Sequence, residues 1–227
     1  MTNPDDRAMA PGCLVIGAAG SGKSAYAEQL CVRFAKRRQC RLCYLATMPD
    51  EGVDARKRIE RHRKLREGKG FETFELPRLL SNTDKAMLER ARESVVLIEC
   101  LGTLVSNELF GCGDADGCRC GAMDDAHLRH VMGDAAWVAC LRASDGMDEP
   151  RRACLMRTLA GVASWIEAAD EVVIVTNDVF ADDGAYDEGT LGYRAVLGAA
   201  NRVLAQRCAN VVEVVCGIPV AVKGDLR

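Results

Sequence analysis

The chain has 227 residues, of which 48% are hydrophobic and 28% charged, which excludes disorder over its whole length and allows the core of one α/β domain. Its thirty basic and thirty-three acidic residues leave a net charge of −3, a balance that favours small-molecule partners over nucleic acid or a membrane surface. Because the first eleven residues lack a secretory apolar run and no stretch approaches the roughly 20 apolar residues of a membrane span, we expect a cytoplasmic protein with no membrane span.

Short apolar runs alternate with longer segments along the chain. The runs that predict strands are residues 13–16, 41–46, 95–98, 172–176 and 211–215. Residues 25–37 show the apolar spacing of a helix directly after the first run. This alternation predicts a single α/β domain over residues 1–227, with a mostly parallel sheet flanked by helices and with ligands at the carboxyl ends of the strands. The last run, residues 218–222, predicts a hairpin at the sheet edge.

Residues 111–150 interrupt the alternation and are interpreted as an insertion, weakly helical over residues 125–141. The segment holds Cys112, Cys118, Cys120, His127 and His130. Because their spacing lacks the paired pattern of a zinc site, we interpret these cysteines as free thiols in a surface loop and the histidines as exposed polar residues.

The other cysteines of the twelve are spread through a chain without an export signal, which favours free thiols over disulfides. Cys13, Cys43 and Cys216 lie in apolar runs, where a thiol behaves as a small hydrophobic group. We therefore expect these three to be buried.

The strongest motif lies between the first predicted strand and the first predicted helix. Its residues are Gly17, Ala18, Ala19, Gly20, Ser21, Gly22, Lys23 and Ser24. They match the phosphate-binding pattern G-x-x-x-x-G-K-[ST] at every fixed position, in the required strand–loop–helix context. The backbone N–H groups of such a loop surround phosphate oxygens, and Lys23 adds a positive charge towards the β- and γ-phosphates.

A P-loop of this kind predicts a Mg²⁺ site beside the triphosphate. The hydroxyl of Ser24 is placed to bind the ion, and a carboxylate is expected at a nearby strand end. Glu99 directly follows residues 95–98 and is the first candidate, whereas Asp178, after residues 172–176, is the second.

Residues 54–67 form a strongly basic predicted helix. Arg58, His62 and Arg66 recur at i+4 spacing, which places an imidazole between two guanidinium groups on one face. A solvated charged helix is the ordinary interpretation of such a run. The chemical interpretation is that the guanidinium groups bind phosphate while neighbouring positive charge keeps His62 neutral, so that it can attack phosphorus.

Several segments, in this order, resemble the bifunctional adenosylcobinamide kinase and adenosylcobinamide-phosphate guanylyltransferase family of cobalamin biosynthesis. They are the P-loop, Tyr44-Leu-Ala-Thr-Met48, Arg58-Ile-Glu-Arg-His62-Arg63, Glu72-Thr-Phe-Glu75, Glu99-Cys-Leu-Gly-Thr-Leu-Val-Ser-Asn107, Val175-Thr-Asn-Asp178 and Val215-Cys-Gly-Ile218. A P-loop is generic, but the R-I-x-x-H-R block followed by E-C-x-x-T-x-x-x-N is specific to this family.

The resemblance implies a RecA-like P-loop NTPase fold, a homotrimer, Mg²⁺, and ATP and GTP as substrates beside a corrinoid. It implies that adenosylcobinamide is phosphorylated first. His62 then takes GMP from GTP as a phosphoramidate and passes it to the corrinoid phosphate, giving adenosylcobinamide-GDP. By position, the resemblance adds Ala46, Thr47, Met48, Arg63, Lys64, Leu65, Arg66, Glu75 and Glu99 to the nucleotide-binding residues of the P-loop.

The chain also departs from the family pattern. Residues 178–184 replace a Glu-Val-Gly-x-Gly loop, and Asn201-Arg202 stands where the family has Asn-Gln. Two other functions fit the P-loop: a kinase of a different small alcohol, in which His62 only helps to bind phosphate, and a non-catalytic nucleotide switch that contacts a partner through the insertion.

Overall fold

The computed structural model describes residues 12–79, 83–111, 129–130, 133–181 and 184–225. Its strands are β1 (Cys13–Gly17), β2 (Arg41–Ala46), β3 (Phe71–Glu75), β4 (Ser94–Glu99), β5 (Glu171–Asn177), β6 (Asn210–Val215) and β7 (Ile218–Lys223). The five apolar runs in the sequence are all strands, and the terminal hairpin is confirmed as β6 and β7. Strand β3 is an additional one, which the sequence pattern did not predict.

The strands form one sheet in the order β3-β2-β4-β5-β1-β6-β7. All neighbours are parallel except β6 and β7. The carboxyl ends of β1, β2 and β4 therefore open on the same edge of the sheet, as expected for a ligand site. The structure confirms the mostly parallel α/β sheet flanked by helices that the sequence predicts, with the P-loop following β1 as in a P-loop NTPase.

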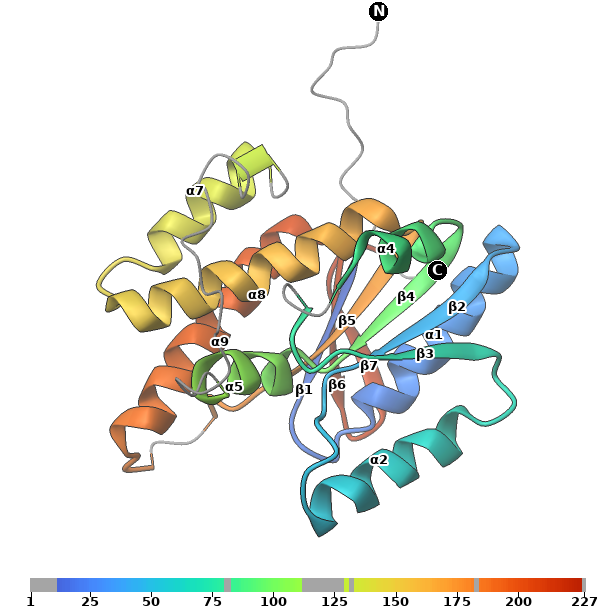
Figure 1. Cartoon of the computed structure of the whole chain (residues 1–227), viewed down its shortest axis with the longest axis horizontal. Helices are drawn as coiled ribbons and strands as arrows, with labels where there is room; N and C mark the ends of the chain where they lie inside the picture. Colours follow the sequence, from blue (N-terminus) through green and yellow to red (C-terminus); the bar gives the residue numbers. More distant parts are fainter. Residues whose placement is uncertain (1–11, 80–82, 112–128, 131–132, 182–183, 226–227) are drawn as a thin grey trace, which may run out of the picture.

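Helices cover both faces of the sheet (Figure 1). They are α1 (Lys23–Arg38), α2 (Val53–Arg66), α4 (Lys85–Ala91), α5 (Leu101–Phe110), α7 (Asp134–Ala143), α8 (Glu149–Ala168) and α9 (Glu188–Arg207). One apolar cluster joins α1 to alternate residues of β1, β2, β4, β5 and β6. A larger cluster joins the opposite side chains of the sheet to α5, α8 and α9. Because the central strands are buried on both faces, their sequences are continuous apolar runs.

Helix α2 differs from the other long helices in its packing. Arg66 is its one buried residue, and Val53 and Leu65 remain exposed at 68% and 42%. In Figure 1 it lies at the end of the sheet near α1, apart from α8 and α9. Because it buries so little apolar surface, polar contacts must contribute much of what holds it in place.

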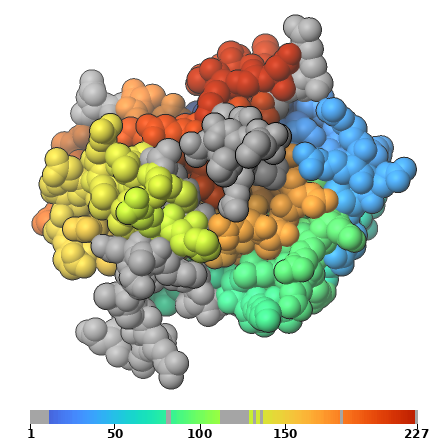
Figure 2. Space-filling view, turned by 90° about the horizontal axis from the view of Figure 1, so that it is seen from above, coloured from blue at the N-terminus to red at the C-terminus, as the bar shows by residue number. Residues whose placement is uncertain are grey.

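The expected insertion is only partly described, and Cys112, Cys118, Cys120 and His127 lie outside the described residues. The described end of the segment is helical, as expected, but the helix runs from Asp134 to Ala143. Trp137 and Cys140 on α7 are 8% and 0% exposed and belong to the larger apolar cluster. Figure 2 shows α7 in yellow on the opposite side of the molecule from the blue residues of α1 and β2. The helix therefore extends the apolar cluster on the face of the sheet opposite α1.

The structure corrects one expectation about thiols. Cys13 and Cys43 are buried as expected, but Cys216 is exposed. It lies in the turn between β6 and β7 with φ of 50°, so its side chain leaves the alternation of the strand before it. His130 is exposed, as expected. None of the helices in the described ranges is both long and apolar enough to cross a membrane.

Candidate functional site

The P-loop connects β1 to α1 and is supported by the β6–β7 turn. Gly22 has φ of 90°, a left-handed conformation that favours glycine, and a Cβ there would lie 3.2 Å from the Cα of Gly217. The N–H of Gly217 donates a hydrogen bond to the carbonyl of Ser21 at 2.8 Å. Both contacts fix the loop against the end of the sheet, which preorganises its backbone N–H groups.

The carboxylate of Glu99 meets the P-loop at the end of β4. The hydroxyl of Ser24 donates to Glu99 Oε1 at 2.8 Å, and Glu99 Oε2 is buried without a hydrogen-bond partner among the described residues. Burial raises the pKa of Glu99 to about 7, against the opposing effects of the Ser24 hydrogen bond and the Lys23 charge. Lys23 is itself 8% exposed and donates to the carbonyl of Ala18 at 3.2 Å. A buried carboxylate with a free oxygen beside a phosphate loop is suited to a cation.

Thr47 connects the ends of β2 and β4. Its hydroxyl donates to the carbonyl of Glu99 at 3.0 Å and accepts from the N–H of Cys100 at 2.8 Å. Asn107 on α5 donates to the carbonyl of Thr47 at 2.7 Å and to that of Pro77 at 2.8 Å. These bonds satisfy backbone groups where the strands end and hold Glu99 in place.

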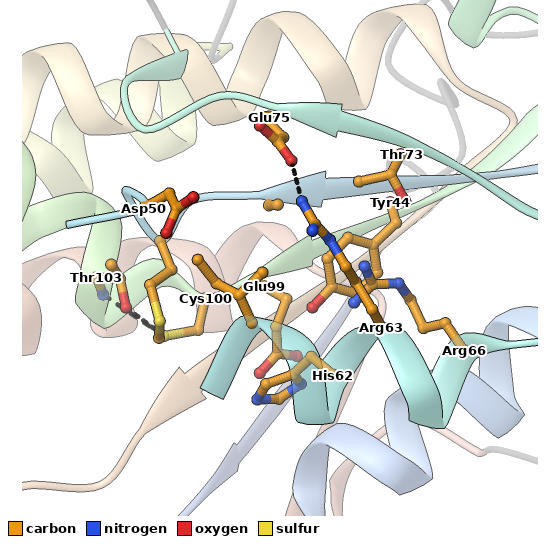
Figure 3. Close-up of a pocket in the computed structure, with 13 residues that line it drawn as sticks. Tyr44, Asp50, His62, Arg63, Arg66, Thr73, Glu75, Glu99, Cys100 and Thr103 are labelled. Atoms are coloured by element: carbon orange, nitrogen blue, oxygen red, sulfur yellow. Dashed lines mark hydrogen bonds and ion pairs between the residues drawn. The ribbon is translucent and has the colours of Figure 1, made fainter. Parts of the chain in front are cut away.

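A cavity of about 570 Å³, partly open to solvent, lies between α2 and the ends of β2, β3 and β4. Its lining residues are Tyr44, Ala46, Met48, Asp50, Ile59, His62, Arg63, Arg66, Thr73, Glu75, Glu99, Cys100 and Thr103. Figure 3 shows the His62 ring on α2 beside the carboxylate of Glu99, with Arg63 directed to Glu75. The pocket therefore brings together predicted residues that are up to 53 positions apart in the chain.

His62 is half-buried, and its Nδ1 has no hydrogen-bond partner in the described part of the chain. Burial lowers the pKa of His62 below its usual value, and the Arg66 charge lowers it further, whereas Glu28 opposes the shift. The imidazole is therefore neutral near pH 7, as expected from the sequence, and a neutral ring has a lone pair for nucleophilic attack.

Arg63 and Arg66 lie at the pocket with His62 as expected, whereas Arg58 does not. Arg66 is 8% exposed and lies with its guanidinium 3.5 Å from the centre of the Tyr44 ring. Arg63 lines the pocket and forms an ion pair with Glu75 at 2.7 Å. Arg58, expected on the same face, is exposed and does not line the pocket. A helix with few apolar anchors can rotate about its axis, so i+4 spacing alone did not fix which cation faces inward.

Two further nucleotide-binding candidates on α2 lie outside the pocket. Lys64 is exposed and pairs with Glu60 at 2.8 Å, and Leu65 is 42% exposed. Their role in nucleotide binding stays a prediction. The second metal candidate, Asp178, instead makes backbone hydrogen bonds. Its carboxylate accepts from the N–H of Phe180 at 3.1 Å, and its own N–H donates to the carbonyl of Gly17.

Sequence reasoning missed several residues at the site. Tyr44, Cys100 and Thr103 line the pocket, and Glu28 on α1 is buried next to it, paired with Lys69 at 2.6 Å. The sequence signal for Glu28 is its i+4 spacing from Ser24, which places both side chains on one face of α1. Tyr44, Cys100 and Thr103 lie inside segments that resemble the family, but no signal in the sequence assigned their side chains to the pocket.

Comparison with known proteins gives two similar solved structures. The flagellar accessory protein FlaH from Methanocaldococcus jannaschii has a TM-score of 0.43 and 10% sequence identity, covering 96% of this chain and 80% of that one. A KaiC-like protein from Pyrococcus horikoshii OT3 has a TM-score of 0.41 and 9% identity, covering 90% and 72%. No curated protein matches the chain.

The family model described as cobinamide kinase / cobinamide phosphate guanyltransferase matches residues 13–222. The match includes the P-loop, the pocket and all strands of the sheet except the last residue of β7, Lys223. The chain therefore belongs to the cobinamide kinase / cobinamide phosphate guanyltransferase family, whose members are bifunctional enzymes of cobalamin biosynthesis.

Proposed function

We propose that the protein phosphorylates adenosylcobinamide and then transfers GMP from GTP to adenosylcobinamide phosphate through a guanylyl-histidine at His62. The observation that carries this proposal is the place of His62: a half-buried imidazole with a lowered pKa lines the same pocket as Glu99, which contacts the P-loop through Ser24. A helix that served only for solubility would not require a buried histidine.

In the first reaction, the P-loop holds a nucleoside triphosphate, ATP or GTP. Its backbone N–H groups and Lys23 bind the phosphate oxygens and stabilise the charge that develops during transfer to the alcohol. The proposed Mg²⁺ would be held by Ser24 and Glu99, and it supplies positive charge to the β- and γ-phosphates. Glu99 Oε2 fits this role, because it is buried without a hydrogen-bond partner among the described residues.

The protein offers few other ligands for the ion. The described residues contain no group of three or more histidine, cysteine or acidic side chains placed to hold a metal. Phosphate oxygens and water would therefore complete the coordination, as is usual for Mg²⁺ bound with a nucleotide.

In the second reaction, the lone pair of His62 attacks the α-phosphorus of GTP. A P–N bond forms while the bond to the bridging oxygen breaks, and pyrophosphate leaves with the electron pair. A phosphate oxygen of the corrinoid then attacks the same phosphorus, the P–N bond breaks, and the imidazole is regenerated with adenosylcobinamide-GDP as product. Arg63 and Arg66, which line the pocket, supply positive charge for both steps.

The test uses GTP labelled at the α-phosphate. With Mg²⁺, the wild-type protein should become labelled, and the label should be lost in acid and retained in base. His62→Ala should remain unlabelled but still phosphorylate adenosylcobinamide, whereas the exposed His130→Ala is the matched control and should label normally. An unlabelled wild-type protein would refute the transferase function and leave a kinase of corrinoids or of another small alcohol.

We also propose, on the strength of the family resemblance, one catalytic domain that assembles as a homotrimer and works in the cytoplasm. Sedimentation equilibrium of the purified chain tests the subunit number, and a monomer at all concentrations would contradict it.

A further inference from the structure

Glu28 is a buried acid that the proposed reactions do not use. It lies on α1 four residues after Ser24 and is 1% exposed. Its Oε2 accepts a hydrogen bond from Lys69 at 2.6 Å, and its Oε1 is buried without a partner among the described residues. A buried carboxylate oxygen without a hydrogen-bond partner is unfavourable, so a donor that reached it in the ligand-bound enzyme would stabilise the site.

The pocket contains a matching unpaired donor. Nδ1 of His62 is buried without a hydrogen-bond partner in the described part of the protein. The negative charge of Glu28 raises the pKa of His62, whereas burial and the Arg66 charge lower it. Glu99 is the other acid in the described ranges with an unpaired buried oxygen, and Figure 3 shows its carboxylate beside the ring. Its other oxygen accepts from Ser24, however, and the proposed Mg²⁺ would occupy the free one.

We propose that Glu28 is a positioning residue for His62, accepting a hydrogen bond from its Nδ1–H so that Nε2 carries the lone pair that attacks phosphorus. This inference rests on the proposed guanylyl-transfer function. The hydrogen bond forms in the nucleotide-bound enzyme, where the triphosphate engages Arg66 and draws the ring towards the α-phosphorus. A hydrogen bond at one ring nitrogen sets which tautomer is present, and a carboxylate is a common partner.

The charge of Glu28 also has a chemical consequence. When Nε2 bonds to phosphorus, Nδ1 keeps its proton and the ring becomes positively charged. A carboxylate at Nδ1–H stabilises that charge, and Lys69 keeps the carboxylate oriented by holding its other oxygen. Glu28 thus assists guanylylation and has no part in the transfer of the γ-phosphate to the alcohol.

The experiment compares Glu28→Gln and Glu28→Ala with wild type in both half-reactions. The rate of labelling by α-labelled GTP should fall by at least about 10-fold, as is typical when the group that orients a reactive histidine is changed. The rate of corrinoid phosphorylation should stay unchanged, which also shows that the variants fold. Lys69→Met is the matched control, because it leaves the carboxylate in place, and its loss of labelling should be smaller than that of either Glu28 variant.

A structural role alone would not change the tautomer of His62, which nitrogen-15 NMR measures. The chain has only three histidines, and His62→Asn identifies the relevant signals. With GTP whose α–β bridging oxygen is replaced by methylene, the wild type should show a protonated Nδ1, and Glu28→Ala should lose this preference. Equal labelling rates, an unchanged tautomer, or a parallel loss of kinase activity would overturn the inference, whereas an unlabelled wild type would instead refute the proposed function.

Discussion

Glu99→Gln should make the nucleotide-free protein more stable at high pH. Burial raises the pKa of Glu99 from 4.5 to about 7. Below pH 4.5 the group is protonated in both folded and unfolded chains and has no effect on stability. Between pH 4.5 and about 7, the carboxyl of Glu99 loses its proton in the unfolded chain but keeps it in the folded chain. The free energy of unfolding therefore falls as pH rises, by a total of about 3 kcal/mol at 1.36 kcal/mol per pKa unit.

Glutamine remains uncharged and can still accept the hydrogen bond from Ser24. Urea unfolding in EDTA should therefore show the variant and wild type equal near pH 4.5, with the variant more stable by about 3 kcal/mol at pH 8. Glu75→Gln is the control, because its carboxylate is exposed at the same edge of the sheet and its replacement should have little effect at any pH. A difference between Glu99→Gln and wild type that does not change with pH would refute the reasoning.

Two further predictions concern the P-loop and α2. Gly22→Ala should weaken GTP binding, measured by calorimetry, more than Gly20→Ala does. Both positions have positive φ and share a backbone strain of about 1–2 kcal/mol in the variants, but only a Cβ at Gly22 meets a neighbour, the Cα of Gly217 at 3.2 Å. Equal losses of affinity would show that this contact is unimportant. Arg66→Lys should lower the free energy of unfolding in urea by roughly 0.5–2 kcal/mol, because it removes the planar guanidinium that stacks on Tyr44. A variant as stable as wild type would show that this contact contributes nothing.

The sequence predicted those parts of the site in which local chemistry and local structure agree. The P-loop combines glycine at a left-handed position with a strand before it and a helix after it, so motif and context confirm each other. Glu99 follows a continuous apolar run, and a strand buried on both faces must end where its ligand edge begins. The structure places Glu99 in hydrogen-bond contact with Ser24 as a result.

Other features depend on tertiary packing and could not be found from one chain. Strand β3 is only five residues long, lies at the sheet edge and carries no regular alternation of polar and apolar side chains. Its pairing with β2 therefore decides its structure more than its composition does. Cys216 continues an apolar run in sequence, but the turn to β7 directs it to solvent. Arg58 and Arg66 share a helix face by spacing, and only the contact with Tyr44 shows which of them is buried.

The two halves of the site are held by different forces. The P-loop and Glu99 extend from central strands whose side chains pack in both apolar clusters, so their positions are fixed before any ligand binds. His62 is carried by α2, which buries one residue. The ion pair Arg63–Glu75 ties this helix to β3, and the ion pair Lys69–Glu28 ties the segment just after it to α1. Elements with few buried apolar contacts open at low free-energy cost. In the proposed mechanism, phosphoryl transfer at the P-loop would therefore use the rigid half alone, whereas guanylylation would also need the weakly anchored α2 to hold His62 against it. Under that mechanism, changes that weaken the anchoring of α2 should slow the second reaction before the first.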